Sequence, residues 1–255
     1  MPNAQRIARL LLVSILTAVA LLGSGAAATA GTLGGASPTR LPTSALEPAN
    51  GAVVGVGHPV TIRFGAPVAD RAVAERAVEI TTSKPVSGHF AWLDDRRVQW
   101  VPDDLWPGHT TVTVAVAGAR TQFQVGDEFV AVANRSTHQF TVLLNGEVVR
   151  TMPASMGKPG YETPVGTFSV LEKFRDLVMD SSTYGVPIDS PEGYRIDTEY
   201  AVRLTWGGIF VHAAPWSVDS QGYANVSHGC INLSTENAQW YFDRVKIGDP
   251  VIVEG

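Results

Sequence analysis

The sequence predicts a mostly β protein, in which an antiparallel β-sandwich is followed by a second β-rich domain with one C-terminal helix. Apolar and polar residues alternate along many short segments, which is typical of strands that bury one face. Clusters of Gly, Pro and Asp separate these segments, and the 25 Gly and 16 Pro residues favour turns over long helices. The segments fall into two blocks, and 255 residues are enough for two compact domains of ordinary size.

The composition excludes several classes of protein. Hydrophobic residues make up 45% of the chain and charged residues 17%, so it is not wholly disordered. The formal net charge is -5 and no basic run exceeds Arg96-Arg97, which argues against nucleic acid as the main partner. Cys230 is the single cysteine, so no intramolecular disulfide can form.

Residues 1–30 have the layout of a secretory signal peptide. Arg6 and Arg9 give a positive start, and Leu10 to Leu22 is an almost uninterrupted apolar run. Small residues then lead to Ala28-Thr29-Ala30, an A-x-A cleavage site. The apolar run is shorter than the roughly 20 residues of a spanning helix, and an uncleaved N-terminal anchor is the alternative. Either way, we expect the rest of the chain to be secreted across the cytoplasmic membrane.

The first β block is expected over residues 46–126, after a flexible Gly-, Ser-, Thr- and Pro-rich linker over residues 31–45. Asp70 to Val78 is expected to form a short helix or an irregular crossover. A block of roughly 80 residues with this pattern suits an Ig-like sandwich without its Cys pair. Its histidines are scattered, which predicts no chemistry in this block. The alternating segments are Val60 to Phe64, Phe90 to Trp92, Val98 to Trp100 and Val112 to Val116.

The second β block is expected over residues 127–255. Asn145-Gly146 separates two apolar runs, which is a strong hairpin signal because both turn positions need a positive φ. One helix is expected to begin at the cap Ser234 and to end before Gly248, because apolar residues recur between them at helical spacing. Further strands are expected at Gly166 to Leu171, Ala201 to Thr205, Ile209 to His212 and Val251 to Glu254.

The chemistry concentrates around Cys230, in the segment Ser227-His228-Gly229-Cys230-Ile231-Asn232. An unpaired thiol in an exported chain suggests a reactive role, whereas the alternative is a small buried hydrophobic residue. The polar neighbours favour a catalytic nucleophile, and Gly229 lets backbone N–H groups approach a ligand closely. The N–H groups of Gly229 and Cys230 could form an oxyanion hole.

A cysteine nucleophile needs a base to take its proton and to hold an ion pair with it. His228 lies two residues from Cys230 and would share its face in an extended segment. His212 ends a predicted strand, and a base on a separate rigid element is the more usual geometry. Both histidines remain open as the base. Zinc held by Cys230, His228 and His212 is a weaker alternative, because no established ligand spacing is present.

These residues resemble the signature of a known family, the L,D-transpeptidase (YkuD-type) catalytic domain. From about Leu46 onwards, the chain resembles mycobacterial L,D-transpeptidases, which combine a signal segment, an Ig-like domain and the catalytic domain. The matching segments are His212 with residues 227–232, Thr163-Pro164-Val165-Gly166-Thr167-Phe168, and Val211-His212-Ala213-Ala214-Pro215-Trp216-Ser217.

The resemblance implies a reaction and its partners. The thiol would attack a peptidoglycan tetrapeptide stem between diaminopimelate and D-Ala, and release D-Ala. The amine of a second diaminopimelate would then resolve the thioester into a 3→3 cross-link. His212 would be the base, oriented by the Ala213 carbonyl, and carbapenems would inhibit. The reaction exchanges one amide for another, so no cofactor, ATP or metal is expected.

The resemblance also implies a substrate channel covered by a lid over Phe174 to Tyr194. The alternatives are ordinary packing for Met179 and Trp216, and a β-bulge for the paired glycines. The residues expected to bind substrate or hold the thiol loop are Tyr194, Gly207, Gly208, Asn232, Ser227, Trp216, Met179 and Tyr184.

Two other functions remain open at this stage. In an L,D-carboxypeptidase, water would resolve the thioester with the same residues. In a non-catalytic cell-wall-binding protein, the Ig-like block would be the binding surface and the cysteine a relic. For the enzyme, we expect the Ig-like block to space or orient the catalytic domain, or to bind the wall.

Overall fold

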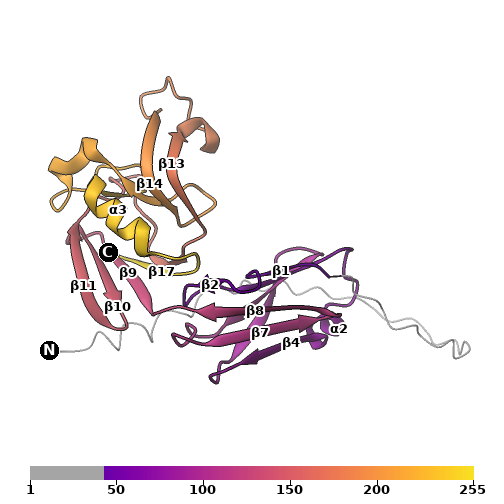
Figure 1. The fold of residues 1–255 in the computed structure, drawn as a ribbon. Helices are drawn as coiled ribbons and strands as arrows, with labels where there is room; N and C mark the ends of the chain where they lie inside the picture. Colours follow the sequence, from indigo (N-terminus) through magenta and orange to yellow (C-terminus); the bar gives the residue numbers. More distant parts are fainter. Residues whose placement is uncertain (1–42) are drawn as a thin grey trace, which may run out of the picture.

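The structure is a computed structural model that describes residues 43–255, and it contains two β-rich units (Figure 1). The expected signal segment over residues 1–30 and most of the expected linker lie outside the described residues. Within residues 43–255, no helix is long and apolar enough to cross a membrane.

The first unit is a sandwich of two four-stranded sheets, as the alternating pattern predicts. Its inward-facing side chains form one apolar core around the buried Trp106. The first sheet has the order β1 (Thr43–Glu47), β3 (Val60–Phe64), β6 (Arg97–Pro102) and β5 (Gly88–Trp92). The second has the order β2 (Val53–Val54), β8 (Ala119–Val125), β7 (Thr111–Val116) and β4 (Val78–Thr82).

Two local features of this sandwich can be compared with the sequence. The short helix expected after Asp70 is present as α2 (Arg71–Arg76), and the Asp70 side chain accepts a hydrogen bond from Val73 N–H at 3.0 Å. β1 begins at Thr43, inside the stretch expected to be a linker. Composition cannot reveal this strand, because it is held by pairing with β3, with Thr43 opposite Phe64.

The second unit also contains two sheets, with most of its core between them and α3 (Thr235–Arg244). Ser234 caps α3 as expected, and α3 packs against β14, β15 and β16. The five-stranded sheet has the order β11 (Glu147–Pro153), β10 (Gln139–Leu144), β9 (Phe129–Asn134), β17 (Pro250–Glu254) and β12 (Gly166–Ser169). The four-stranded sheet has the order β13 (Glu172–Asp180), β14 (Arg195–Arg203), β15 (Phe210–Ala213) and β16 (Ile231–Leu233).

Local turn chemistry agrees with the sequence at one hairpin and differs at the lid. Asn145 and Gly146 join β10 to β11 with φ of 51° and 84°, as the Asn-Gly signal predicts. The lid is shorter than expected, because Phe174 to Asp180 belongs to β13 and pairs with β14. The two strands project as a long hairpin (Figure 1), so the lid proper is the connection over residues 181–194.

The two units meet where the backbone of residues 55–57 runs against the segment before β17. Gly55 N–H donates to Ile247 O and Gly57 N–H donates to Gly248 O, both at 2.8 Å. A Cβ on Gly55 would lie 2.1 Å from the Asp249 nitrogen. Glycine is therefore required at this close approach, and the backbone hydrogen bonds tie the sandwich to the second unit.

Asp249 is fully buried at this junction. Its Oδ2 accepts a hydrogen bond from Lys246 N–H at 2.7 Å, while its Oδ1 has no hydrogen-bond partner among the described residues. Burial raises the pKa of this carboxyl from 3.8 to about 7, against the opposing effect of the Lys246 N–H. Asp249 therefore carries a proton in the folded protein under mildly acidic conditions.

We predict that the free energy of unfolding falls as pH rises from about 4 to about 7, because the unfolded chain releases the Asp249 proton first. The resulting fall in the free energy of unfolding is at most about 4 kcal/mol. Asp249→Asn should remove it. Denaturant titrations across this pH range measure the effect, with Asp243→Asn, an exposed residue of α3, as the control. A pH dependence equal in wild type and Asp249→Asn would contradict the assignment.

Candidate active site

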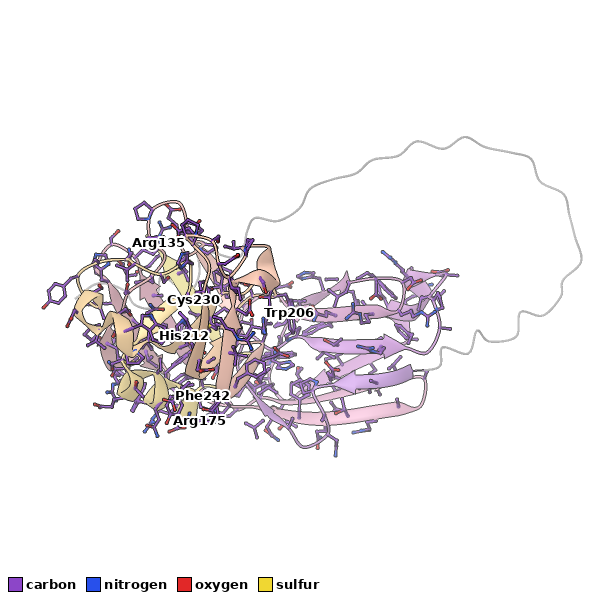
Figure 2. All side chains as sticks on the ribbon, turned by 90° about the horizontal axis from the view of Figure 1, so that it is seen from above. Arg135, Arg175, Trp206, His212, Cys230 and Phe242 are labelled. Carbon is purple, nitrogen blue, oxygen red and sulfur yellow. The ribbon has the colours of Figure 1, made fainter. Side chains whose placement is uncertain are left out.

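The pairing of β15 with β16 brings the two principal candidates together. These strands run parallel, with Val211 opposite Ile231 and His212 opposite Asn232. His212 lies within β15, and Cys230 directly precedes β16. Both side chains line the same pocket, and Figure 2 labels both within the second unit.

The His212 ring is held in one orientation and is neutral. Its Nδ1–H donates to the Ala213 carbonyl at 2.8 Å, which agrees with the role that the resemblance implies for this carbonyl. Burial lowers the pKa of the imidazole to about 4, and the hydrogen bond to Ala213 opposes this effect only in part. With a proton on Nδ1, the Nε2 atom carries the free lone pair and is able to accept a proton.

Cys230 is a thiol at rest. Its Sγ lies 3.5 Å from Gly208 O and accepts a hydrogen bond from Phe210 N–H. The side chain packs with Met179, Ala201 and Phe210, and this burial raises the pKa of the thiol to about 11. Burial therefore favours the neutral forms of Cys230 and His212 at rest over the expected ion pair, because neither charge is solvated in this apolar setting.

The Ser227 hydroxyl is hydrogen-bonded to the backbone of the loop that carries the thiol. Ser227 Oγ accepts a hydrogen bond from Gly229 N–H at 3.0 Å and donates one to Cys230 O at 2.6 Å. Gly229 has a φ of 120°, and a Cβ there would lie 2.9 Å from Ile209 Cδ1. Gly229 N–H, one of the two expected oxyanion donors, is therefore engaged by Ser227 in this conformation, and its role toward an oxyanion stays a prediction.

Thr163 also holds this loop, a role that sequence reasoning did not assign. The residue is fully buried, its Oγ1 donates to Gly229 O at 2.8 Å, and it accepts from Gly157 N–H at 2.9 Å. Thr163 begins the segment 163–168, which matches the family, and this match was the signal in the sequence that the residue has a role in the site. The sequence could not show that it contacts a loop far along the chain.

The pocket around the thiol has a volume of about 280 Å³. Trp216 is 52% exposed at its rim, so this residue is not simply a packing residue. The predicted site residues that line the pocket are Met179, Tyr194, His212, Trp216, Ser227, His228, Cys230 and Asn232.

Asn232 presents an unused acceptor in this pocket. Its Nδ2 donates to Ser217 Oγ at 3.1 Å, and its Oδ1 is buried with no partner among the described residues. A buried carbonyl oxygen without a donor is destabilising unless a ligand supplies the missing hydrogen bond. Asn232 is therefore well suited to accept a hydrogen bond from a substrate N–H group.

The predicted glycines line a different pocket on the other side of Met179 and Tyr194. This pocket, about 410 Å³ in volume, includes Gly207 and Gly208 and also Met179 and Tyr194. The glycines form the turn between β14 and β15 rather than a bulge, with Gly208 N–H donating to Thr205 O at 3.3 Å. Tyr184 ends the 3-10 helix η1 (Ser181–Tyr184), and its contact with substrate stays a prediction.

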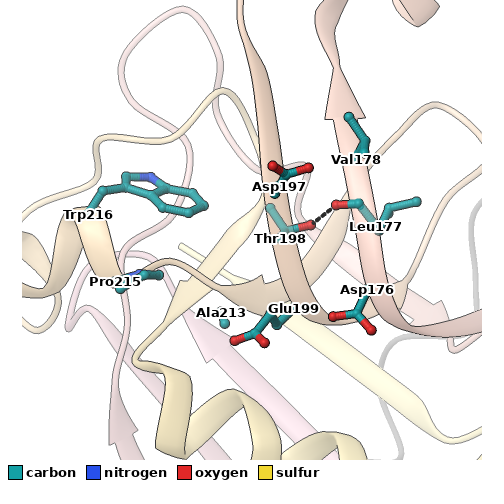
Figure 3. Close-up of a pocket in the computed structure, with 9 residues that line it drawn as sticks. All are labelled: Asp176, Leu177, Val178, Asp197, Thr198, Glu199, Ala213, Pro215 and Trp216. Atoms are coloured by element: carbon teal, nitrogen blue, oxygen red, sulfur yellow. Dashed lines mark hydrogen bonds between the residues drawn. The ribbon is translucent and has the colours of Figure 1, made fainter.

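A third pocket, of about 550 Å³, lies beside the thiol pocket and shares Thr198 and Trp216 with it (Figure 3). It presents the carboxylates of Asp176, Asp197 and Glu199, and the Thr198 hydroxyl donates to Leu177 O at 2.8 Å. Neither candidate catalytic side chain lines it. The reaction chemistry therefore belongs to the smaller neighbouring pocket.

His228, the other candidate base, is engaged elsewhere. Its Nε2 lies 2.6 Å from Glu192 Oε2, and its ring lies between Tyr161 and Tyr194. When Nε2 donates to the carboxylate, only Nδ1 of His228 keeps a lone pair, whereas His212 is held by the Ala213 carbonyl with its Nε2 as the acceptor, so the geometry favours His212. The zinc alternative finds no site in residues 43–255, where no three His, Cys, Asp or Glu side chains gather to hold a metal ion.

Comparisons with known proteins agree with this geometry. The L,D-transpeptidase catalytic domain family matches residues 128–253, and the bacterial Ig domain family matches residues 16–120. L,D-transpeptidase 1 of Mycobacterium tuberculosis is 55% identical over 212 residues, which cover 83% of this chain and 84% of the relative. The chain belongs to the L,D-transpeptidase family. The mostly β fold, with an Ig-like sandwich before the catalytic domain, is thereby confirmed.

Solved structures of this family align with most of the chain, across both units. One is LD transpeptidase LdtMt1 in complex with imipenem, with a TM-score of 0.80, 54% identity, and coverage of 84% of this chain and 99% of that one. Another is L,D-transpeptidase 3 from Mycobacterium tuberculosis in complex with a faropenem-derived adduct. It has a TM-score of 0.77, 47% identity, and coverage of 84% of this chain and 98% of that one.

The raised thiol pKa predicts how Cys230 reacts with iodoacetamide. We expect the alkylation rate to rise about tenfold per pH unit through neutrality, without a plateau, because the thiolate fraction is still growing below about pH 11. Intact-mass kinetics between pH 6 and 9 measure it, and the unfolded chain, with an ordinary thiol pKa of roughly 8.5, is the control. A rate already independent of pH below neutrality would show a resting ion pair instead.

Proposed function

We propose that this protein is a cysteine acyltransferase that forms 3→3 cross-links between peptidoglycan stem peptides. The observation that carries the proposal is the placement of His212 on β15 and of Cys230 directly before the parallel strand β16, both lining one pocket, in a chain of the L,D-transpeptidase family. The donor is a tetrapeptide stem, and the acceptor is the side-chain amine of diaminopimelate on a second stem. D-Ala is the leaving product.

The acylation step follows from the neutral resting pair. As Sγ of Cys230 attacks the carbonyl between the third and fourth stem residues, its proton passes to Nε2 of His212. The imidazolium is stabilised by the Ala213 carbonyl at Nδ1. The same proton then passes to the amine of D-Ala as the amide C–N bond breaks, which leaves a thioester on Cys230.

The second step is the reverse sequence with a different amine. The diaminopimelate amine attacks the thioester carbonyl and gives a proton to His212. The thiolate of Cys230 leaves, and it recovers the proton from the imidazolium. One amide is exchanged for another of similar energy, so the reaction needs no ATP, metal or other cofactor.

The negative oxygen formed in each step needs a hydrogen-bond donor. Gly229 N–H is occupied by Ser227, so the Cys230 N–H is the backbone donor that we assign to the oxyanion. Thr163 supports this assignment, because its bond to Gly229 O fixes the plane of the peptide that carries this N–H. Ser227, His228 and Gly229 therefore shape the thiol loop.

The two pockets beside Met179 and Tyr194 suit two peptide substrates. In the thiol pocket, Asn232 Oδ1 accepts a hydrogen bond from a substrate N–H group, and Trp216 packs on the substrate at the rim. On the other side, Gly207 and Gly208 allow a peptide backbone to approach closely. Tyr184 contacts substrate from the lid.

The domain organisation fits a reaction outside the cytoplasm. We assign residues 1–30 to a signal peptide or anchor, 31–42 to a linker, 43–126 to the Ig-like domain, because β1 begins at Thr43, and 127–255 to the catalytic domain. The enzyme then acts in the periplasm or cell wall, and the Ig-like domain spaces the catalytic domain from the membrane or binds the wall. Because relatives have been solved with imipenem and a faropenem-derived adduct, we also expect carbapenems to acylate Cys230.

We predict that Cys230→Ala forms no cross-linked product while keeping its fold. The test is mass spectrometry of products from a disaccharide-tetrapeptide, with an intact melting temperature as the control for folding. Wild type should release D-Ala and yield a dimer. A wild-type product that never contains the acceptor amine would show an L,D-carboxypeptidase, and turnover by Cys230→Ala would exclude the thioester route.

We further predict that His212→Ala slows acylation of Cys230 by a carbapenem by about 10²- to 10⁴-fold, because general base catalysis is lost. His228→Ala is the matched comparison and should slow it far less, since its Nε2 faces Glu192. Stopped-flow absorbance of the β-lactam ring measures both rates. The opposite ranking of the two variants would transfer the role of base to His228.

A further inference from the structure

A three-residue polar cluster joins the lid to the thiol loop. Glu192 Oε2 lies 2.6 Å from Lys158 Nζ and 2.6 Å from His228 Nε2. Glu192 belongs to the lid, His228 lies two residues before Cys230, and Lys158 belongs to the loop that precedes β12. One carboxylate oxygen therefore connects three segments that are far apart in the sequence.

Aromatic rings enclose this cluster. His228 lies edge-on to Tyr161, with 5.0 Å between ring centroids, and 5.4 Å from the tilted ring of Tyr194. Lys158 Nζ lies 5.1 Å from the centre of the Tyr161 ring. The His228 side chain is only 25% exposed, so its bond to Glu192 is partly shielded from water. Charge-assisted hydrogen bonds in such settings are stronger than those on an open surface.

The base of the lid is held independently of Glu192. Ser181 N–H donates to Tyr194 O at 3.0 Å, and Tyr194 N–H donates to Ser181 Oγ at 2.9 Å. Gly185, with a φ of 91°, lets the chain turn after η1. Removing the Glu192 carboxylate therefore releases one side of the lid and leaves its attachment to β13 and β14 in place.

Both hydrogen bonds favour the charged form of Glu192. The bond from Lys158, followed by the bond from His228, lowers the pKa of this carboxyl below its ordinary value. The carboxylate is thus negative throughout the neutral range, and it holds Nε2 of His228 in a hydrogen bond.

We propose that Glu192 is a positioning residue that fastens the lid to Lys158 and His228, and thereby limits the access of water and small molecules to Cys230. The importance of excluding water rests on the proposed function, because a thioester that awaits an amine must survive hydrolysis. Glu192 does not itself line the thiol pocket, so it acts through His228, which does.

The test compares Glu192→Ala with wild type in the full chain, using iodoacetamide at fixed pH. Loss of a partly shielded ion pair should open the lid more often, and should raise the rate of Cys230 alkylation about fivefold. Asp189→Ala removes an exposed carboxylate from the same lid and should leave the rate unchanged. Glu192→Gln keeps the size of the side chain and should give an intermediate rate.

Three results would overturn the proposal. The first is an unchanged alkylation rate in Glu192→Ala, and the second is an equal rise of the rate in Asp189→Ala. The third is a rise in Glu192→Ala that disappears when this variant and wild type are each measured the same number of degrees below their own melting temperatures. Lys158→Met should also raise the rate, and the double variant with Glu192→Ala should be no faster than Glu192→Ala alone, because both changes break one contact.

The alkylation arm requires no peptidoglycan reaction, so it separates this proposal from the proposed function. If wild type forms the cross-linked product, Glu192→Ala should also direct a larger share of the thioester to water, measured as free tripeptide against dimer. If wild type forms no such product, the proposed function fails while the alkylation result still decides the role of Glu192.

Discussion

The parallel pairing of β15 with β16 is the constraint on which the rest of the site depends. It places His212 beside Asn232 and brings Cys230 to the start of the neighbouring strand, so the proposed base and nucleophile are positioned by the sheet itself. The core packed behind these strands, including α3, keeps the register fixed, because a slip by one residue would turn His212 out of the pocket. Catalysis on this scaffold is therefore a property of strand pairing as much as of side-chain chemistry.

Burial then determines the protonation of the pair. An apolar environment disfavours charge on either group, which is why the thiol pKa rises while that of the imidazole falls. Burial favours a neutral Cys230 thiol and a neutral His212 imidazole, and charge develops only as the sulfur attacks a substrate carbonyl. The Ala213 carbonyl also sets the tautomer of His212, because it accepts the Nδ1–H and leaves the lone pair on Nε2.

Polar contacts from outside the two strands complete the site. The hydroxyls of Ser227 and Thr163 form hydrogen bonds with the backbone of the thiol loop. They thereby determine which N–H groups remain available to a substrate. Glu192 brings the lid to the same loop from the opposite direction. The sandwich is joined to the catalytic unit at glycines near the buried Asp249, so its orientation is set by backbone contacts rather than by an apolar interface alone.

The sequence by itself determined the two β-rich units, the Asn145-Gly146 hairpin, the capped helix α3 and the family, and it predicted Cys230 as the nucleophile with His212 and His228 as candidate bases. These depend on local periodicity, turn chemistry and a specific motif, which act over a few neighbouring residues. Only the tertiary structure decided that His228 Nε2 bonds to Glu192, that Gly229 N–H donates to Ser227, that β13 shortens the lid, and that Thr163 holds the thiol loop. Each of these depends on contacts between segments distant in the chain and on burial, and neither is encoded in a local pattern.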